Sequence, residues 1–298
     1  MSKVKKINIH TEPRWGLVRE MWKVLKQDKT GLSGLIIILG IIGVAVFAPY
    51  LSPYGFSEQH ILDSFQGPGR GYLLGTDEFG RDLLTRIIWG SRPALLVGVL
   101  SVLVSIGIGV PIGLMAGYKM GWVDRIVSWW VDVALSFPSI LLGLMIVILL
   151  GPGLVNVALA IGISHVPQYI RLARGPTMAL RNLDFVSASK ALGATDWRIA
   201  FVHILPNIVG PIIIMGTLSI AGAIRMEASL SFLGFGVTPP DPSWGNLIRE
   251  GVNNILQSPW MALFPGLALT FSVLAFNMVG DSLRDIFDPR AILDQKKG

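Results

Sequence analysis

Six apolar blocks, each about 20 residues long, constrain the fold of this chain more than any other feature of its sequence. A helix of about 20 mostly apolar residues is long enough to cross the hydrocarbon core of a bilayer. We therefore expect an all-α, polytopic membrane helix bundle with six transmembrane helices. The predicted spans run over residues 32–51, 93–117, 126–150, 154–173, 207–229 and 261–281.

The composition supports a membrane environment and excludes several kinds of site. Hydrophobic residues make up 52% of the 298 residues and charged residues 15%, which leaves too few polar side chains to cover a soluble surface. The absence of cysteine excludes thiolate chemistry and disulfides, and the four scattered histidines offer no pair at metal-ligand spacing, so no metal site is expected. The formal net charge of +6 does not indicate nucleic-acid binding, because no basic face interleaved with aromatic residues remains.

The distribution of basic residues predicts the orientation in the membrane. With six spans, 19 of the 25 Lys and Arg residues fall on the side that also holds both termini. Positive charge near span ends stays in the cytoplasm, so both termini are expected there, in a multi-pass protein of the cell (inner or plasma) membrane. The first block is expected to remain as an anchor, because its end, AVFAPY, lacks the A-x-A site at which a signal peptide is cleaved.

The connection between the fourth and fifth spans is too long and too regular for a passive loop. Asp184 is placed to cap a short helix that continues to about Leu192, and Gly193 is expected to end it in a left-handed conformation. Thr195 or Asp196 then caps a second helix, which is expected to run until Pro206. The sequence thus predicts a compact knob of two helices joined by a glycine hinge.

The second helix of this knob carries an apolar stripe. Trp197, Phe201 and Ile204 are spaced by four and three residues, so they share one face. Such a stripe suits either a groove on a partner protein or the underside of the bundle itself, and the pattern does not decide between them.

This knob resembles the cytoplasmic loop of the membrane permease subunits of bacterial ABC importers. That loop reads E-A-A, three residues, Gly, nine residues and I-x-L-P, and the spacing is kept here, with serine in place of the glutamate and of the second alanine, and with His203 in place of isoleucine. In the family the loop is a coupling helix that docks onto an ATP-hydrolysing subunit, and the fold is that of a type I importer permease. The coupling residues that the resemblance implies are Ser187, Ala188, Ser189, Gly193, Ala194, Trp197, Leu205 and Pro206.

Two further stretches, LLGTDEFGRDLLTRIIWGSR and EASLSFLGFGVTPPDPSWGNLI, are similar to the C-type permease subunit of dipeptide, oligopeptide and nickel importers. The likeness covers about residues 73–289. It implies a non-catalytic subunit whose partners are a homologous B-type permease, two ABC ATPase subunits and an extracytoplasmic solute-binding protein. No G-x-x-x-x-G-K-[S/T] loop occurs in the sequence, so no cofactor is expected in this chain, and ATP and Mg are expected in the partner ATPases. The substrate is expected to be a dipeptide or oligopeptide, with nickel or another small solute as the alternative.

The first of these stretches also predicts an amphipathic helix before the second span. Thr76 or Asp77 is placed to cap it, and Asp82 is placed to pair with Arg86 one turn later. Leu83, Leu84, Ile87 and Ile88 would form its apolar face. The helix is either an inert lead into the span or part of the frame at which a receptor delivers substrate.

Several charged residues and prolines lie where they are candidates for the transport pathway. Arg225 and Glu227 fall near the outer end of the fifth span and should point about 200° apart on a helix, so they are expected not to pair with each other. Each either reaches to the interface or serves the pathway, and Glu227 is a candidate for an outer gate or for binding a peptide's amino terminus. Asp132 in the third span is a further candidate, with structural pairing as its alternative role. Pro111 and Pro138 are expected to kink their helices.

The segment TPPDPSWGNL predicts a stiff external loop, which is either pure architecture or a seat for the external receptor. The candidate receptor contacts are Asp77, Arg81, Pro240 and Trp244.

The predicted organisation is one membrane bundle with short extramembrane parts. These are a cytoplasmic N-terminal segment (1–31), a first anchor (32–51), an external segment with the amphipathic helix (52–92), a five-helix permease core (93–281) that includes the coupling loop (174–206) and an external loop (236–260), and a cytoplasmic tail (282–298).

The sequence gives little support to two other function classes. An intramembrane hydrolase would rest on Ser164 and His165, but neighbours on a helix point in different directions and no orienting acid is evident. A secondary transporter would show symmetry-related repeats with broken helices, and no such repeat is seen. A requirement for ATP and for a second protein discriminates among the three classes.

Overall fold

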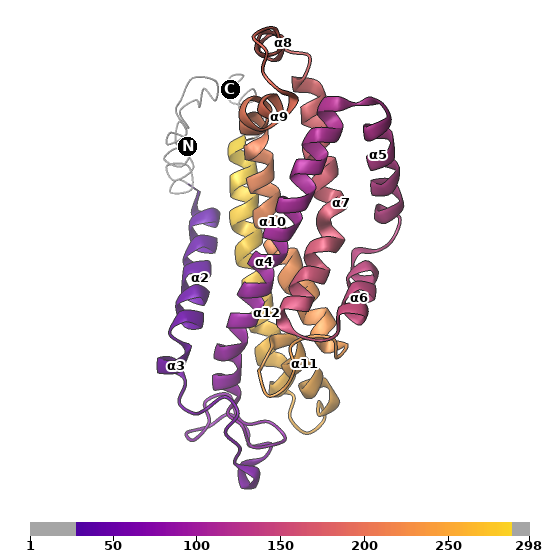
Figure 1. Cartoon of the computed structure of the whole chain (residues 1–298). Coiled ribbons are helices and arrows are strands. Elements are labelled where there is room, and N and C mark those ends of the chain that lie inside the picture. The colour runs from indigo at the N-terminus through magenta and orange to yellow at the C-terminus, as the bar shows by residue number, and fades with distance from the viewer. Residues whose placement is uncertain (1–27, 288–298) are drawn as a thin grey trace.

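The computed structural model describes residues 28–287 and folds them into a bundle of long helices (Figure 1). Predictions made for the basic N-terminal segment and for the tail therefore fall mostly outside the described residues. In chain order the helices are α2 (Lys29–Val46), α3 (Ala48–Leu51), η1 (Ile61–Asp63), α4 (Leu83–Lys119), α5 (Gly121–Leu135), α6 (Ser139–Leu150), α7 (Leu154–Leu180), α8 (Asp184–Ala191), α9 (Asp196–Arg198), η2 (Ile199–Ile204), α10 (Leu205–Phe232), α11 (Trp244–Asn253) and α12 (Trp260–Phe287).

The predicted spans all fall on helices of this bundle. Within residues 28–287, four helices are long and apolar enough to cross a membrane, namely α2, α4, the continuous helix Asp196–Phe232 and α12. The bent pair of α5 and α6 is a candidate for a fifth. The remaining predicted span lies on α7, which is 27 residues long but does not meet the same test. The structure is thus consistent with six spans, and it shows an all-helical bundle.

The predicted amphipathic helix and the second span form one helix, contrary to the expectation of two separate elements. Helix α4 runs for 37 residues and contains both Pro93 and Pro111 without ending at either. At 1.5 Å per residue it is about 55 Å long, well beyond a hydrocarbon core of about 30 Å. Its first turns therefore extend past the core, where they meet α11 and the segment that precedes α4 (Figure 1).

The third predicted span is broken at Pro138. Helices α5 and α6 meet at an angle of 94° across the break, and Pro138 takes an extended conformation as the N-cap of α6. A proline cannot donate the backbone hydrogen bond that would continue α5, and it disfavours a helical conformation in Phe137 before it. The predicted kink is confirmed, and it is a complete interruption of the helix.

Small residues bring α4 and α7 into close contact. Gly109, Gly113 and Gly117 recur every fourth residue and so lie on one face of α4. A methyl group on Gly109 would sit 2.8 Å from the carbonyl oxygen of Val166, and one on Gly113 would collide with the carbonyl oxygen of Ile170. Close approach of backbones at such small-residue stripes is a common basis of helix packing in membranes.

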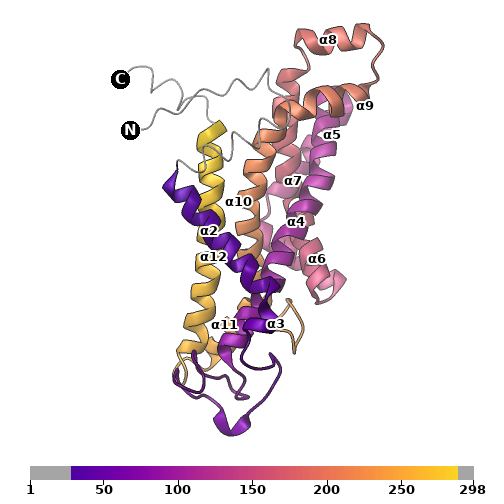
Figure 2. The same ribbon diagram turned by 90° about the vertical axis from the view of Figure 1, so that its left-hand side faces the viewer.

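The two described ends of the chain lie together, at the end of the bundle that also carries α8 and α9 (Figures 1 and 2). Asp28 caps α2 by accepting hydrogen bonds from the backbone amides of Thr30 and Gly31, and it also accepts one from the hydroxyl of Ser282 near the end of α12. The segment between α3 and α4, together with α11, lies at the opposite end. The two ends of the bundle therefore carry different elements and different candidate sites.

Candidate coupling and pathway sites

The knob at the first end of the bundle has the predicted hinge. Helix α8 covers Asp184–Ala191, and Gly193 follows with φ of +79°. Thr195 caps the next helix by accepting a hydrogen bond from the amide of Arg198 at 3.3 Å. Asp184 is the first residue of α8, whereas its N-cap is Leu183, which has no side chain able to cap. In Figure 2, α8 lies across the direction of the long helices and beyond their ends.

The second helix of the knob does not end at Pro206, as the sequence predicts. It continues through η2, a π-helical segment, into α10, so that Asp196–Phe232 forms one helix of 37 residues. The ring of a proline in a regular α-helix clashes with the carbonyl group four residues earlier. The wider π turns just before Pro206 re-route the backbone hydrogen bonds there, which allows the helix to continue.

The apolar stripe is divided between the bundle and the surface. Ile204 is fully buried in the core that the end of α4 and α7 form, while 59% of Trp197 is exposed. The ring of Phe201, which is partly buried, stacks on that of Trp197 with a centroid distance of 4.0 Å. The stripe thus packs against the bundle at Ile204, and the partner groove stays a prediction, for which Trp197 is the part left exposed.

The other motif residues of the knob mostly face outward. Ser187, Ala188, Gly193 and Pro206 are exposed, and Ser189, Ala194 and Leu205 are partly buried. The apolar side chain of Leu192 is 88% exposed at the tip beside Gly193. Exposed apolar side chains on a structured knob are typical of a surface that another protein covers.

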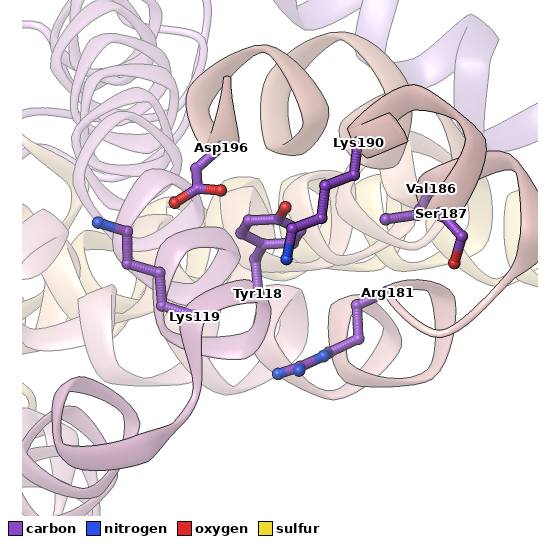
Figure 3. Close-up of a pocket in the computed structure, with 7 residues that line it drawn as sticks. All are labelled: Tyr118, Lys119, Arg181, Val186, Ser187, Lys190 and Asp196. Carbon is purple, nitrogen blue, oxygen red and sulfur yellow. The ribbon is translucent and has the colours of Figure 1, made fainter. Parts of the chain in front are cut away.

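A basic cavity of about 280 Å³ lies between this knob and the ends of α4 and α7. Figure 3 shows Lys119, Arg181 and Lys190 arranged around Tyr118, with Asp196 as the one acid and Ser187 on the rim. Within residues 28–287, none of the three cations forms an ion pair. The cavity therefore carries an excess of positive charge next to the position where the family's glutamate is replaced by serine.

At the other end of the bundle, a buried ion network joins the external segment to α11. The carboxylate of Asp77 accepts hydrogen bonds from Arg81 Nε at 2.6 Å and from Arg86 Nη1 at 2.5 Å. Arg86 also bonds Glu250 of α11 at 2.7 Å. The predicted pair of Asp82 and Arg86 is therefore wrong, since Asp82 instead caps α4 through the amide of Thr85 at 2.7 Å.

This network changes the interpretation of the candidate receptor contacts. Asp77 is completely buried and Arg81 nearly so, and Trp244 is buried with its indole donating to the carbonyl oxygen of Ile87 at 3.0 Å. None of these three side chains is open to a receptor in this structure, because each is used to fix the external segment or α11 to α4. Pro240, in contrast, is exposed.

Tyr72 forms a further contact within the external segment. Its hydroxyl donates to Asp63 at 2.9 Å, and its ring packs beside Tyr54 at a centroid distance of 5.3 Å. Burial, reinforced by the carboxylate of Asp63, raises the pKa of Tyr72 to about 12. The network and this cluster together give a segment of little regular secondary structure a defined shape.

In the half of α10 nearer to α11, Arg225 and Glu227 point in opposite directions, as their spacing predicts. Glu227 is 1% exposed and accepts a hydrogen bond from the hydroxyl of Ser231 at 2.6 Å. Arg225 is exposed and lines a groove of about 380 Å³ between α6, α10, α11 and α12. The structure therefore leaves Arg225 accessible, whereas the burial of Glu227 removes it from direct contact with a solute.

The remaining candidates form local contacts. Asp132 pairs with Arg171 at 2.7 Å, and both side chains are more than half exposed. The hydroxyl of Ser164 donates to the carbonyl oxygen of Ile161 at 2.8 Å, and Nδ1 of His165 lies 2.8 Å from the same oxygen. Because a carbonyl accepts only from a protonated nitrogen, that nitrogen cannot also take a proton from Ser164. The pair therefore lacks the geometry of a nucleophile and its base.

The chain is similar to known membrane proteins over most of its length. Residues 109–293 match the family model described as the inner membrane component of binding-protein-dependent transport systems, and residues 16–68 match the N-terminal transmembrane domain of oligopeptide transport permease C. The chain is 44% identical, over 91% of its length and 90% of the relative's, to the dipeptide transport system permease protein DppC of Alkalihalophilus pseudofirmus. It is 42% identical to the glutathione transport system permease protein GsiD of Pectobacterium atrosepticum, with 91% of each chain covered. It is also 42% identical to the di/tripeptide transport system permease protein DppC of Pseudomonas aeruginosa, with 92% of each chain covered.

Among solved structures, the fold matches a permease chain from inward-facing conformations of the MetNI methionine ABC transporter. The TM-score is 0.56 at 18% identity, and the match covers 69% of this chain and 97% of the other. At this identity the likeness concerns the fold of the helical core alone.

Proposed function

Because the chain belongs to the family of inner membrane components of binding-protein-dependent transport systems, we propose that it forms half of the translocation pathway of an ATP-driven importer of dipeptides or oligopeptides. The observation that carries the proposal is the structured, outward-facing knob of α8 and α9 at one end of a membrane bundle. The three relatives, permeases for dipeptides, glutathione and di/tripeptides, support a peptide as the solute.

In this proposal the knob lies in the cytoplasm and docks onto an ATPase subunit, with both termini on the same side. Ser187, Ala188, Leu192 and Trp197 provide the exposed surface of the docking site. The chain itself provides no catalytic residue, and ATP and Mg are bound by the partner ATPases. A second, homologous permease completes the pathway, and a solute-binding protein approaches the opposite end, where Pro240 is the remaining candidate contact.

The basic cavity adds a chemical preference to the docking site. Lys119, Arg181 and Lys190 surround a space beside Ser187, and Asp196 balances only one of the three charges. Unpaired cations that line one cavity are stabilised by an acidic partner that forms charge-assisted hydrogen bonds. We therefore expect the ATPase to place an acidic side chain at this cavity. In the family motif, by contrast, the permease provides the acid, as a glutamate.

A pair of matched substitutions tests the docking role. Leu192→Arg and Leu62→Arg make the same change at two side chains that pack against nothing in this chain, since they are 88% and fully exposed. They lie at opposite ends of the bundle, so only the first adds bulk and charge to the knob. Both variants should insert and fold normally.

The complex is solubilised gently from its native membrane, and the proteins that copurify with each variant are identified by mass spectrometry. We expect a second permease and P-loop ATPases with the wild type and with Leu62→Arg, and loss of the ATPases with Leu192→Arg. ATP-dependent uptake of a dipeptide into vesicles should likewise be retained by the wild type and by Leu62→Arg and lost in Leu192→Arg. Retention of the ATPases by Leu192→Arg with normal uptake would refute the docking site, and uptake by the chain alone without ATP would refute the importer itself.

A further inference from the structure

The groove beside Arg225 is apolar except for Arg225 and Ser229 of α10. Its other lining residues are Ile140 of α6, Ala228, Phe232 and Leu233 on and just after α10, Ile248 of α11 and Leu269 of α12. Its volume of about 380 Å³ lies within the range of pockets that bind small molecules, about 300–1,000 Å³. Residues of four helices thus surround one cation.

The position of Arg225 along α10 makes an exposed guanidinium there unfavourable unless something binds it. Arg225 precedes the last residue of α10, Phe232, by seven positions, which corresponds to about 10 Å along the helix axis. A charged side chain that faces lipid at depth is disfavoured, and intramembrane charges generally face a pathway or a partner. Within residues 28–287, the guanidinium of Arg225 forms no ion pair and no hydrogen bond.

We propose that Arg225 binds the carboxylate of the transported peptide as the peptide passes the outer half of the pathway. A guanidinium matches a carboxylate with two parallel hydrogen bonds, and these bonds are stronger where water is excluded, as it is beside apolar walls. Every linear peptide carries one terminal carboxylate, while its side chains vary, so a single cation in an apolar groove recognises the constant part and tolerates the rest. This inference rests on the proposed function and names the group of the solute that this chain contacts.

The same chemistry has another source, a carboxylate on the second permease subunit. The two sources differ in their consequences. A bond to the partner subunit would stabilise assembly and be independent of the solute. A bond to the peptide would leave assembly unchanged and depend on whether the peptide's carboxylate is free.

The test uses the solubilised transporter complex without its solute-binding protein, so that the receptor's own selectivity does not enter. Binding of trialanine and of trialanine amide is measured by calorimetry for the wild type, Arg225→Gln, Arg225→Lys and the control Arg249→Gln. Arg249, on α11, is a second cation of this region; it is partly buried and does not line the groove. Subunit content is measured in parallel.

We expect the wild type and Arg249→Gln to bind the free acid at least about tenfold more tightly than the amide, the usual effect of one charge-assisted hydrogen bond. Arg225→Gln should bind both peptides equally weakly while keeping its subunits, and Arg225→Lys should restore part of the preference. The same preference in Arg225→Gln, no preference or no binding in the wild type, or loss of the second permease from Arg225→Gln would each overturn the proposal. If the wild-type complex still contains its ATPases in those cases, the importer function stands and only the carboxylate site fails.

Discussion

Replacing Asp77 with alanine should release the external segment from the helices that it packs against. Asp77 is the only acid that contacts both Arg81 and Arg86 at less than 3 Å within the described residues. Its other carboxylate oxygen accepts the backbone amides of Phe79 at 2.9 Å and of Arg81 at 3.0 Å. The substitution thus removes an anion from two buried cations and leaves two amides without their acceptor.

The magnitude follows from the burial of the network. Breaking a buried ion pair by removing one partner costs about 3–5 kcal/mol, because the remaining charge stays buried without compensation. Glu250 still neutralises part of this charge through its bond to Arg86, so the contributions of the separate bonds are not summed. The local free energy of opening of the segment should therefore fall by about 3–5 kcal/mol, or by its full value if that is smaller.

Hydrogen exchange of backbone amides measures this quantity directly. The amides of Thr76 and Leu83 are bonded to Gln66 O and Gly75 O, both at 3.0 Å, so they report on opening of the segment. Their exchange should accelerate on the order of 100- to 4000-fold in Asp77→Ala, since each 1.4 kcal/mol corresponds to a factor of ten. An acceleration below about tenfold would show that the two arginines find other compensation, and the reasoning would fail.

A matched control lies in the same segment. Glu58 pairs with His60 at 3.2 Å, but both side chains are more than a third exposed. An exposed ion pair contributes about 0–1 kcal/mol, so Glu58→Ala should accelerate the same amides by about fivefold at most. Equal effects of the two substitutions would mean that burial does not determine the strength of these bonds.

Three further outcomes are expected. Gly113→Leu should prevent recovery of a monodisperse protein, because a side chain there collides with the backbone of α7, whereas Gly107→Leu, where a methyl group meets no atom within 4 Å, should be tolerated; size-exclusion chromatography compares the two. Because the folded-state pKa of Tyr72 is raised to about 12, its stabilising contribution is complete below about pH 10 and is lost as the pH rises through 12; the difference in absorbance at 295 nm between the wild type and Tyr72→Phe should therefore rise near pH 12 and not near pH 10. Lys190→Glu should weaken retention of the ATPases most at low salt, where electrostatic attraction is least screened, and washing the immobilised complex with increasing salt measures this.

Local chemistry allowed the knob to be predicted from the sequence in some detail. Gly193 takes a left-handed conformation and Thr195 caps the following helix, because turn glycines and capping hydroxyls act within a few residues. The predicted helix end at Pro206 is wrong, because a proline inside a helical pattern usually ends or kinks the helix. The π-helical segment before it is a cooperative backbone arrangement that no single residue of the motif indicates.

The ion network around Asp77 shows where local reasoning stops. The pairing of Asp82 with Arg86 satisfies the i, i+4 spacing of a helix. Arg86 instead forms ion pairs with Asp77 and with Glu250, which is 164 residues away. Nothing in the sequence near Arg86 signals Glu250, so the partner follows only from the tertiary fold. The same limit applies in α10, where helical periodicity predicts that Arg225 and Glu227 diverge but not which of them is buried.

The continuity of one helix links the two candidate sites physically. Asp196 at the knob and Arg225 at the groove belong to the same helix, and their separation of 29 positions corresponds to about 44 Å. A helix transmits displacement along its axis, and here the π-helical segment and Pro211 are the places where its hydrogen bonding departs from the regular pattern. A partner that moves the knob therefore acts on the segment that carries Arg225 without any intervening loop. Under the proposed function, this arrangement connects a charged knob at one end of the helix with an accessible arginine near the other.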